Sequence, residues 1–110
     1  MVLTQTEQYM WADRILRAVC LVGEIPFTEL VSERRSDKTD KLRGVYCLLT
    51  RDFGVHPDRA ARLISRTRQN VINQAKRYAQ HVQVHDREIT MLYSKIKENL
   101  KQYDDNEKRL

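Results

Sequence analysis

The sequence predicts an all-α protein. Apolar residues recur at spacings of three and four along most of the chain, and no long stretch alternates apolar and polar residues as a strand does. Helix-capping and helix-breaking residues separate the periodic segments. A chain of 110 residues, 41% of them hydrophobic and 32% charged, can bury one modest core. We therefore expect residues 1–110 to form a single helical domain.

The first helix is expected to begin after Thr4, which has capping-box spacing with Glu7. Four apolar residues follow at helical spacing: Trp11, Ile15, Ala18 and Val22. Gly23 is a natural end for this helix. Pro26 then breaks the chain, and residues 27–31 are expected to form a turn or a short helix.

Three further segments precede the C-terminal part of the chain. Residues 32–40 are polar and charged, and we expect them to form a flexible loop. A second helix is expected over residues 41–53, with Gly54 ending it. Pro57 suits the first turn of a third helix, and the Thr67 hydroxyl can cap a fourth, so these two helices are joined by a tight turn.

The apolar pattern continues at spacings of four and three into the C-terminal part of the chain. Its members are Val71, Ala75, Tyr78, Val82, His85, Ile89, Leu92 and Ile96. Such a stripe buries one helix face against another helix. Because Asp86 can start a new helix, we expect a bend or break between Gln80 and Asp86. Residues 101–110 are expected to form a tail that frays from Asp104.

The net charge of +5 is concentrated in the middle of the chain. Residues 1–33 carry two basic and five acidic side chains, and residues 78–110 carry six of each. Residues 34–77 carry twelve basic and four acidic side chains. A polyanion attracts such a segment through the release of counterions, whatever its sequence. Ordinary solvated surface charge explains a basic total, but it explains this concentration less well.

The third and fourth helices have the spacing of a helix-turn-helix. That motif needs a small residue facing the partner helix, a small residue in the turn, and an apolar residue pointing inward from the second helix. Ala61, Ser65 and Val71 meet these three needs. The alternative is an ordinary helical hairpin with a polar outer face.

The outward positions of the fourth helix are rich in hydrogen-bonding side chains. They are Arg68, Gln69, Asn70, Asn73 and Lys76. Arginine pairs bidentately with guanine, and glutamine or asparagine pairs with adenine. The sequence therefore predicts that Arg68, Gln69, Asn70 and Asn73 read DNA bases.

Residues 34–100, about two thirds of the chain, resemble the C-terminal DNA-binding domain of the bacterial replication initiator DnaA, which has a Trp-repressor-like helical fold. The resemblance begins at Arg34-Arg35 and follows Leu-Arg-Gly-Val-Tyr-Cys-Leu-Leu-Thr-Arg-Asp-Phe over residues 42–53. It continues through residues 57–78 and, more weakly, from His85-Asp86 to Leu100. Residues 1–33 have no counterpart. They are expected to be an added helix that packs its Trp11 stripe on the bundle or pairs with a second subunit.

The family's signature at the turn is Gly-Arg-Asp-His-Thr-Thr-Val, and the matching residues here are Ser-Arg-Thr-Arg-Gln-Asn-Val over positions 65–71. Arg66 and Val71 keep the family's residues, and Ser65 takes the glycine position. The four residues between Arg66 and Val71 differ, at positions that read bases in the family. The resemblance therefore implies the family's fold and docking, but not its DNA target.

The same resemblance implies further DNA contacts. Arg34 or Arg35 corresponds to a basic loop that inserts arginine into the adjacent minor groove, where a narrow, negative groove attracts it. The basic residues near the family's DNA backbone correspond to phosphate-positioning candidates here. With the residues of the turn and of the fourth helix, the predicted phosphate contacts are Lys41, Arg43, Arg51, Arg66, Thr67, Lys76 and Arg77.

Several function classes have no motif behind them. No apolar run approaches the roughly 20 residues of a membrane span, and no signal peptide is recognisable, so we expect an intracellular protein. The resemblance to the DnaA domain implies a cytoplasmic, nucleoid-associated bacterial protein. No Gly-rich phosphate loop is present, so no nucleotide is expected. His81 and His85 have a spacing that can ligate zinc but lack a third ligand, and no catalytic constellation stands out. Cys20 and Cys47 are expected to be reduced thiols. We expect no enzyme, cofactor or metal.

Two functions therefore compete. The first is sequence-specific binding of double-stranded DNA through the helix-turn-helix, as a transcription regulator or replication-associated accessory protein. The alternative is a helical adaptor whose C-terminal stripe, Val82 to Ile96, mediates oligomerisation while its basic face binds an acidic protein. A homodimer through the N-terminal or C-terminal helices is compatible with both.

Overall fold

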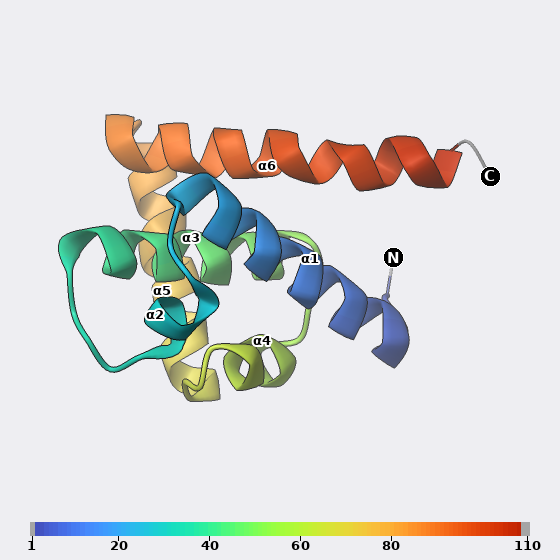
Figure 1. Ribbon diagram of the computed structural model, residues 1–110, viewed down its shortest axis with the longest axis horizontal. Helices are drawn as coiled ribbons and strands as arrows, with labels where there is room; N and C mark the ends of the chain where they lie inside the picture. The colour runs from blue at the N-terminus through green and yellow to red at the C-terminus, as the bar shows by residue number, and fades with distance from the viewer. Residues whose placement is uncertain (1, 109–110) are drawn as a thin grey trace.

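The chain folds into helices packed around one buried helix (Figure 1). The computed structural model describes the backbone of residues 2–108 and the side chains of residues 2–103, and every regular element in that range is an α-helix. The elements are α1 (Gln5–Gly23), α2 (Phe27–Val31), α3 (Asp37–Asp52), α4 (Pro57–Leu63), α5 (Arg68–Gln83) and α6 (Arg87–Lys108). The predicted all-α class is confirmed.

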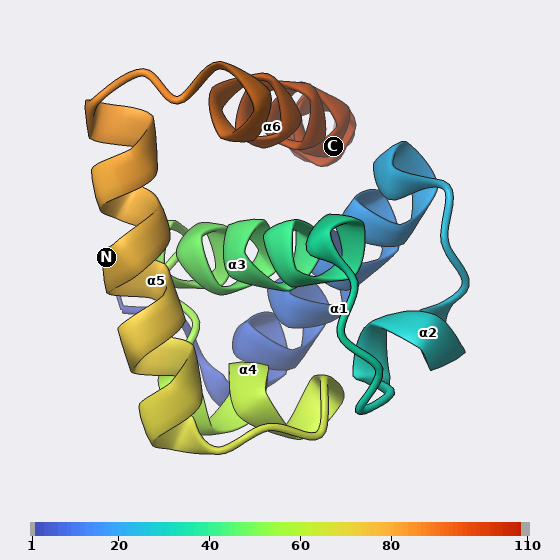
Figure 2. The ribbon, with the colours of Figure 1, turned by 90° about the vertical axis from the view of Figure 1, so that its left-hand side faces the viewer.

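α3 is the central helix of the fold. Every residue from Leu42 to Thr50 is buried, and α3 contacts each of the other helices. α5 crosses it on one side, and α1 and α6 lie against it elsewhere (Figure 2). A helix that is buried on all sides suits the centre of a small domain, where each neighbour covers part of its surface.

The crossing of α3 and α5 depends on Gly44. A Cβ atom added at Gly44 would overlap the aromatic ring of Tyr78, which lies directly over the glycine. The Tyr78 hydroxyl donates to the backbone carbonyl of Asp40, one turn earlier on α3, over 3.3 Å. The missing side chain of Gly44 therefore lets α5 approach α3 closely.

The capping box at the start of α1 is confirmed. The Glu7 amide donates to the Thr4 hydroxyl oxygen over 3.1 Å, and the Thr4 amide donates to the Glu7 carboxylate over 3.0 Å. α1 ends at Gly23, as expected, and the residue that follows it, Glu24, adopts the left-handed conformation with φ +55°. A Cβ at Gly23 would lie 2.5 Å from a methyl carbon of Leu42, so this glycine serves close packing.

The loop before α3 is shorter than expected. Residues 27–31 form the short helix α2, one of the two predicted alternatives. α3 then begins at Asp37 and not at Lys41, because the Ser36 hydroxyl caps it by accepting from the Thr39 amide over 3.1 Å. The segment between α2 and α3 is therefore limited to residues 32–36.

The added N-terminal helix packs on the rest of the chain. Trp11 is buried, with its ring centroid 5.0 Å from that of Phe53 and 6.3 Å from that of Tyr103. The guanidinium of Arg14 lies over both Trp11 and Tyr103, at 4.9 and 4.4 Å from the ring centroids. Of the two expectations for this helix, packing on the bundle is the one observed.

α5 and α6 are separate helices, as predicted, because α5 ends at Gln83 and α6 begins at Arg87. His85 lies in the break with φ +58° and is exposed, so it does not belong to the apolar stripe. α6 continues through Lys108, beyond the point where fraying is expected. Residues 109 and 110 of the predicted tail lie outside the described residues.

Candidate nucleic-acid interface

α4 and α5 are joined by a tight turn over residues 64–67. Ser65 adopts φ +55°, the left-handed conformation that glycine adopts most easily, which fits its place at the family's glycine position. The Arg66 amide donates back to the Ala61 carbonyl over 3.0 Å, which reverses the chain direction. The Thr67 hydroxyl then caps α5 by accepting from the Asn70 amide over 3.1 Å, as predicted. α4 itself begins at Pro57, after His56, whose ring nitrogen accepts from the Asp58 amide.

Of the three residues expected to hold this unit together, Ala61 and Val71 are buried, whereas Ser65 in the turn is exposed. Ala61 and Val71 are each 3% exposed, and Ile64 is fully buried. The predicted outward residues of α5 are all exposed: Arg68, Gln69, Asn70, Asn73 and Lys76. α5 therefore presents a continuous polar face to solvent, beginning at its first turn.

The contacts within this face are weak surface contacts. The Gln69 side-chain amide donates to the Asn73 side-chain oxygen over 3.0 Å. Arg68 lies 3.9 Å from the Asp58 carboxylate of α4, with both side chains more than half exposed. Exposed pairs of this kind contribute little free energy. The side chains can therefore exchange these partners for a ligand at low cost.

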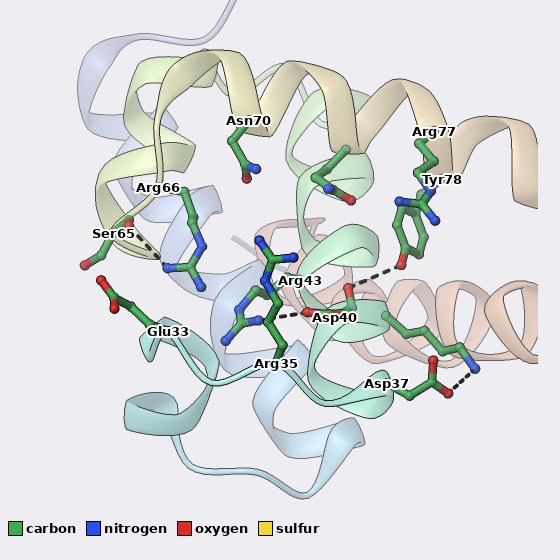
Figure 3. Close-up of a pocket in the computed structure, with 12 residues that line it drawn as sticks. Glu33, Arg35, Asp37, Asp40, Arg43, Ser65, Arg66, Asn70, Arg77 and Tyr78 are labelled. Carbon is green, nitrogen blue, oxygen red and sulfur yellow. Dashed lines mark hydrogen bonds and ion pairs between the residues drawn. The ribbon is translucent and has the colours of Figure 1, made fainter.

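A polar groove of about 640 Å³ separates α5 from the segment before α3 (Figure 3). Arg35 extends from residues 32–36 towards α5, while Asn70 and Arg77 extend from α5 into the same space. Five basic and three acidic side chains line the groove, which makes its net charge positive. The lining residues are Glu33, Arg35, Asp37, Asp40, Lys41, Arg43, Ser65, Arg66, Asn70, Gln74, Arg77 and Tyr78.

The assignment of Arg43 to a phosphate contact is wrong, because its guanidinium is buried and fully used inside the protein. Its side chain is 8% exposed and lies 3.1 Å from the Asp40 carboxylate. The guanidinium also donates to the carbonyls of Leu30, Ser32 and Arg34 over 2.7, 2.7 and 3.0 Å. Burial, and next the nearby charge of Arg66, lower the pKa of Arg43 below its ordinary value. Arg43 anchors the segment before α3 and does not face a ligand.

Arg66 supports the same segment from the other side. Its guanidinium donates to the carbonyl of Ser32 over 2.7 Å and to that of Val31 over 3.3 Å. Two weaker bonds, over 3.3 Å, go to the carbonyls of Ile64 and Ser65. Because the Arg66 side chain already donates to backbone oxygens, it is less available for the predicted phosphate contact.

Lys41, another predicted phosphate contact, is paired with two carboxylates. Its ammonium lies 2.7 Å from the carboxylate of Glu88 on α6 and 2.9 Å from that of Asp37, and its side chain is 21% exposed. These hydrogen bonds, the one to Glu88 first, raise the pKa of Lys41 above its ordinary value. A lysine neutralised by two carboxylates attracts a phosphate poorly. Lys41 instead ties α3 to α6.

The remaining predicted contacts keep an exposed side chain: Arg34, Arg35, Arg51, Thr67, Lys76 and Arg77. The Thr67 hydroxyl oxygen is engaged as the helix cap, so only its hydrogen is left to donate. Arg35 and Arg77 line the groove, whereas Arg51 and Lys76 lie at a different pocket on α3 and α5. The structure therefore divides the predicted phosphate contacts between two flanks of α5.

Sequence reasoning missed four residues of the groove, namely Gln74, Glu33, Asp37 and Asp40. Gln74 follows Asn70 by four positions and therefore shares its helix face, so helical spacing could have found it. No sequence signal places the three acidic side chains at the groove, because they depend on how residues 32–40 fold back towards α5. Their charge lowers the positive potential there.

The other candidate sites are not assembled. His81 lies 3.7 Å from the Asp86 carboxylate, and His85 is exposed in the break that follows α5. Among the described side chains, no three metal-ligating groups converge. Both cysteines are free thiols, and burial raises the pKa of Cys47 to about 12.

The chain matches no protein-family model, no curated protein and no solved structure. The resemblance to the DnaA domain therefore stays a prediction. Within the described part of the chain, no helix combines the length and the apolar character that crossing a membrane requires.

Proposed function

We propose that the protein binds double-stranded DNA sequence-specifically, as a regulator or a replication-associated accessory protein of the bacterial nucleoid. In this proposal α4 and α5 act as a helix-turn-helix, and α5 enters the major groove. The observation that carries the proposal is the exposed polar face at the start of α5, which lies across a basic groove from Arg35.

The side chains at the start of α5 suit base reading. A recognition helix contacts base edges mainly through its N-terminal residues, and Arg68, Gln69, Asn70 and Asn73 occupy this part of α5. All four are exposed, and the hydrogen bonds among them are of the exchangeable surface type. Each good bidentate pair discriminates between bases by about 1–3 kcal/mol, or roughly 5- to 150-fold in affinity.

The segment over residues 32–36 suits a second contact. Arg43 and Arg66 hold its carbonyls, which leaves Arg34 and Arg35 exposed at a fixed distance from α5. An arginine held there can enter the minor groove beside the major groove that α5 occupies. One sugar–phosphate backbone would then run along the groove between them, with Arg77 as a phosphate contact.

The resemblance to the DnaA domain supports this way of docking on DNA. It does not imply that the protein reads the DNA sequence that the family binds. Ser65 occupies the glycine position of the turn with the conformation that glycine favours. Thr67, Arg68, Gln69 and Asn70 replace the residues that read bases in the family. We therefore expect a different DNA sequence to be read.

The adaptor hypothesis, in which the stripe from Val82 to Ile96 mediates oligomerisation, has less support from the structure. Ile89 and Ile96, from the stripe assigned to oligomerisation, are buried within the monomer, where α6 packs on α1 and α3. The other part of that hypothesis is that the basic face binds an acidic protein. The DNA-binding test below includes this result as the one that would contradict DNA binding.

The test begins with selection of binding sites from random duplexes, followed by fluorescence anisotropy on the selected duplex and on a scrambled one over a range of salt. We expect the variant Arg68→Ala/Gln69→Ala to lose preference for the selected duplex and to keep salt-dependent binding to both. The variant Lys95→Ala/Gln102→Ala, which likewise removes one basic and one amide side chain but from exposed positions of α6, should keep the preference. Equal losses on both duplexes would refute base reading, and retention on polyglutamate but not on DNA would refute the proposal.

A further inference from the structure

A second pocket, of about 360 Å³, lies between α3 and α5. α5 contributes Val71, Ile72, Ala75 and Lys76 to it, whereas the polar groove takes Asn70, Gln74 and Arg77 from the same helix. At 100° per residue these two sets lie on opposite flanks of α5. The pocket is therefore separate from the groove, and its volume falls within the range of roughly 300–1,000 Å³ that small-molecule sites occupy.

The walls of this pocket are largely apolar. Cys47, Val55, Val71 and Ala75 line it and are buried, and Pro57 and Ile72 are half-buried beside them. Thr50 also lines it, but its hydroxyl donates to the Cys47 carbonyl over 2.9 Å. The walls thus offer a ligand an apolar contact surface, and the polar contacts have to come from the rim.

The rim carries two cations and no acidic side chain. Arg51 comes from α3 and Lys76 from α5, and both are exposed. The ion-pair contact of Arg51 is with Asp52 at 3.9 Å, and Lys76 makes no ion pair with any described residue. Two weakly paired cations at the mouth of an apolar pocket complement an anion with an apolar body.

We propose that this pocket binds an amphipathic monocarboxylate, with its apolar chain between α3 and α5 and its carboxylate at Arg51 and Lys76. The carboxylate accepts charge-assisted hydrogen bonds from both cations, and the chain removes apolar surface of Pro57 and Ile72 from water. Because Arg51 and Lys76 are also expected phosphate contacts, the bound acid would weaken DNA binding, a consequence that rests on the proposed function.

The probe is octanoate, titrated into the full chain without DNA while methyl and amide NMR signals are recorded. 1-Octanol and octylammonium serve as matched neutral and cationic probes. We expect octanoate to shift the signals of Val55, Val71 and Ile72, and to bind more tightly than 1-octanol, with octylammonium the weakest.

Two variants complete the test. Arg51→Gln/Lys76→Gln should weaken octanoate binding by at least about tenfold, because hydrogen bonds to charged groups are lost, and should leave 1-octanol binding unchanged. Lys38→Gln/Lys95→Gln, which removes the same charge from exposed positions elsewhere, should bind octanoate like the parent. The proposal is overturned if millimolar octanoate shifts none of the pocket signals, or if the first variant binds octanoate as tightly as the second. Neither result depends on whether the protein binds DNA.

Discussion

Arg43 and Arg66 donate hydrogen bonds to the same carbonyl oxygen, that of Ser32, each over 2.7 Å. Arg43 reaches this oxygen from α3, and Arg66 reaches it from the turn between α4 and α5. Their like charges oppose each other, which contributes to the lowered pKa of Arg43. Backbone carbonyls and the Asp40 carboxylate offset this repulsion. The segment over residues 32–36 is thereby tied to α3 and to the turn that precedes α5.

Replacing Arg43 with glutamine should lower the free energy of unfolding by about 2–4 kcal/mol, because charged hydrogen bonds are lost and buried carbonyls are left without donors. Urea unfolding followed by circular dichroism measures the change. Arg62→Gln, at an exposed position of α4, is the control and should change stability by less than about 0.5 kcal/mol. If both variants are equally stable, Arg43 is not an anchor.

Replacing Gly44 with alanine should destabilise the protein by about 1–3 kcal/mol, since the new methyl group overlaps the Tyr78 ring. Thermal and urea unfolding of Gly44→Ala, Tyr78→Leu and the double variant form a mutant cycle. The smaller leucine should relieve part of the overlap, so the double variant should lose less than the two single losses combined. Strict additivity would show that Gly44 and Tyr78 do not limit the approach of α5.

Replacing Ser65 with glycine should stabilise the protein by about 0.5–1 kcal/mol, because glycine adopts the observed φ of +55° without the steric cost that a Cβ atom imposes. Ser65→Ala retains the Cβ atom and is expected to show no such gain. Calorimetric melting of the three proteins distinguishes them. A gain shared by alanine and glycine would point away from backbone strain.

The capping box at α1 should make stability depend on pH in the acid range. Hydrogen bonds from the Thr4 backbone, and next from its side chain, lower the pKa of Glu7 below its ordinary value of 4.5. A lowered carboxyl pKa stabilises the fold above the unfolded value of 4.5, and this contribution is lost as the pH falls through the folded pKa. We expect the parent to be more stable than Glu7→Gln at pH ~7, and we expect this difference to shrink as the pH is lowered towards ~3. Urea midpoints at both pH values test this, and a constant difference would contradict it.

Elements whose signals are local could be predicted from the sequence. Thr4, Pro57 and Thr67 start helices where expected, since caps and prolines act on the next turn of chain. The exposed face of α5 followed from helical spacing, because Val71 and its partners fix which side is buried.

The hydrogen-bond and ion-pair partners of the basic side chains could not be predicted from such local signals. The partners of Arg43 are mainly backbone carbonyls 9 to 14 positions earlier. Every residue type has a backbone carbonyl, so the sequence does not indicate which carbonyls Arg43 contacts. Glu88, which pairs with Lys41, lies 47 positions away. The sequence does not distinguish an arginine or lysine that anchors a loop from one that binds phosphate. Only the folded structure shows which partners the side chain has.

The packing of Trp11 against Tyr103 has a consequence for the order of events during synthesis. The two rings meet edge to face with their centroids 6.3 Å apart, although 92 positions separate them in the chain. A nascent chain emerges from its N-terminus, so the apolar face of α1 reaches the ribosome surface long before the segment that covers it. α1 is therefore covered fully only after α6 has been made. Trp11 is the single tryptophan of the sequence, so its fluorescence should change when Phe53 packs on it and again when Tyr103 of α6 does.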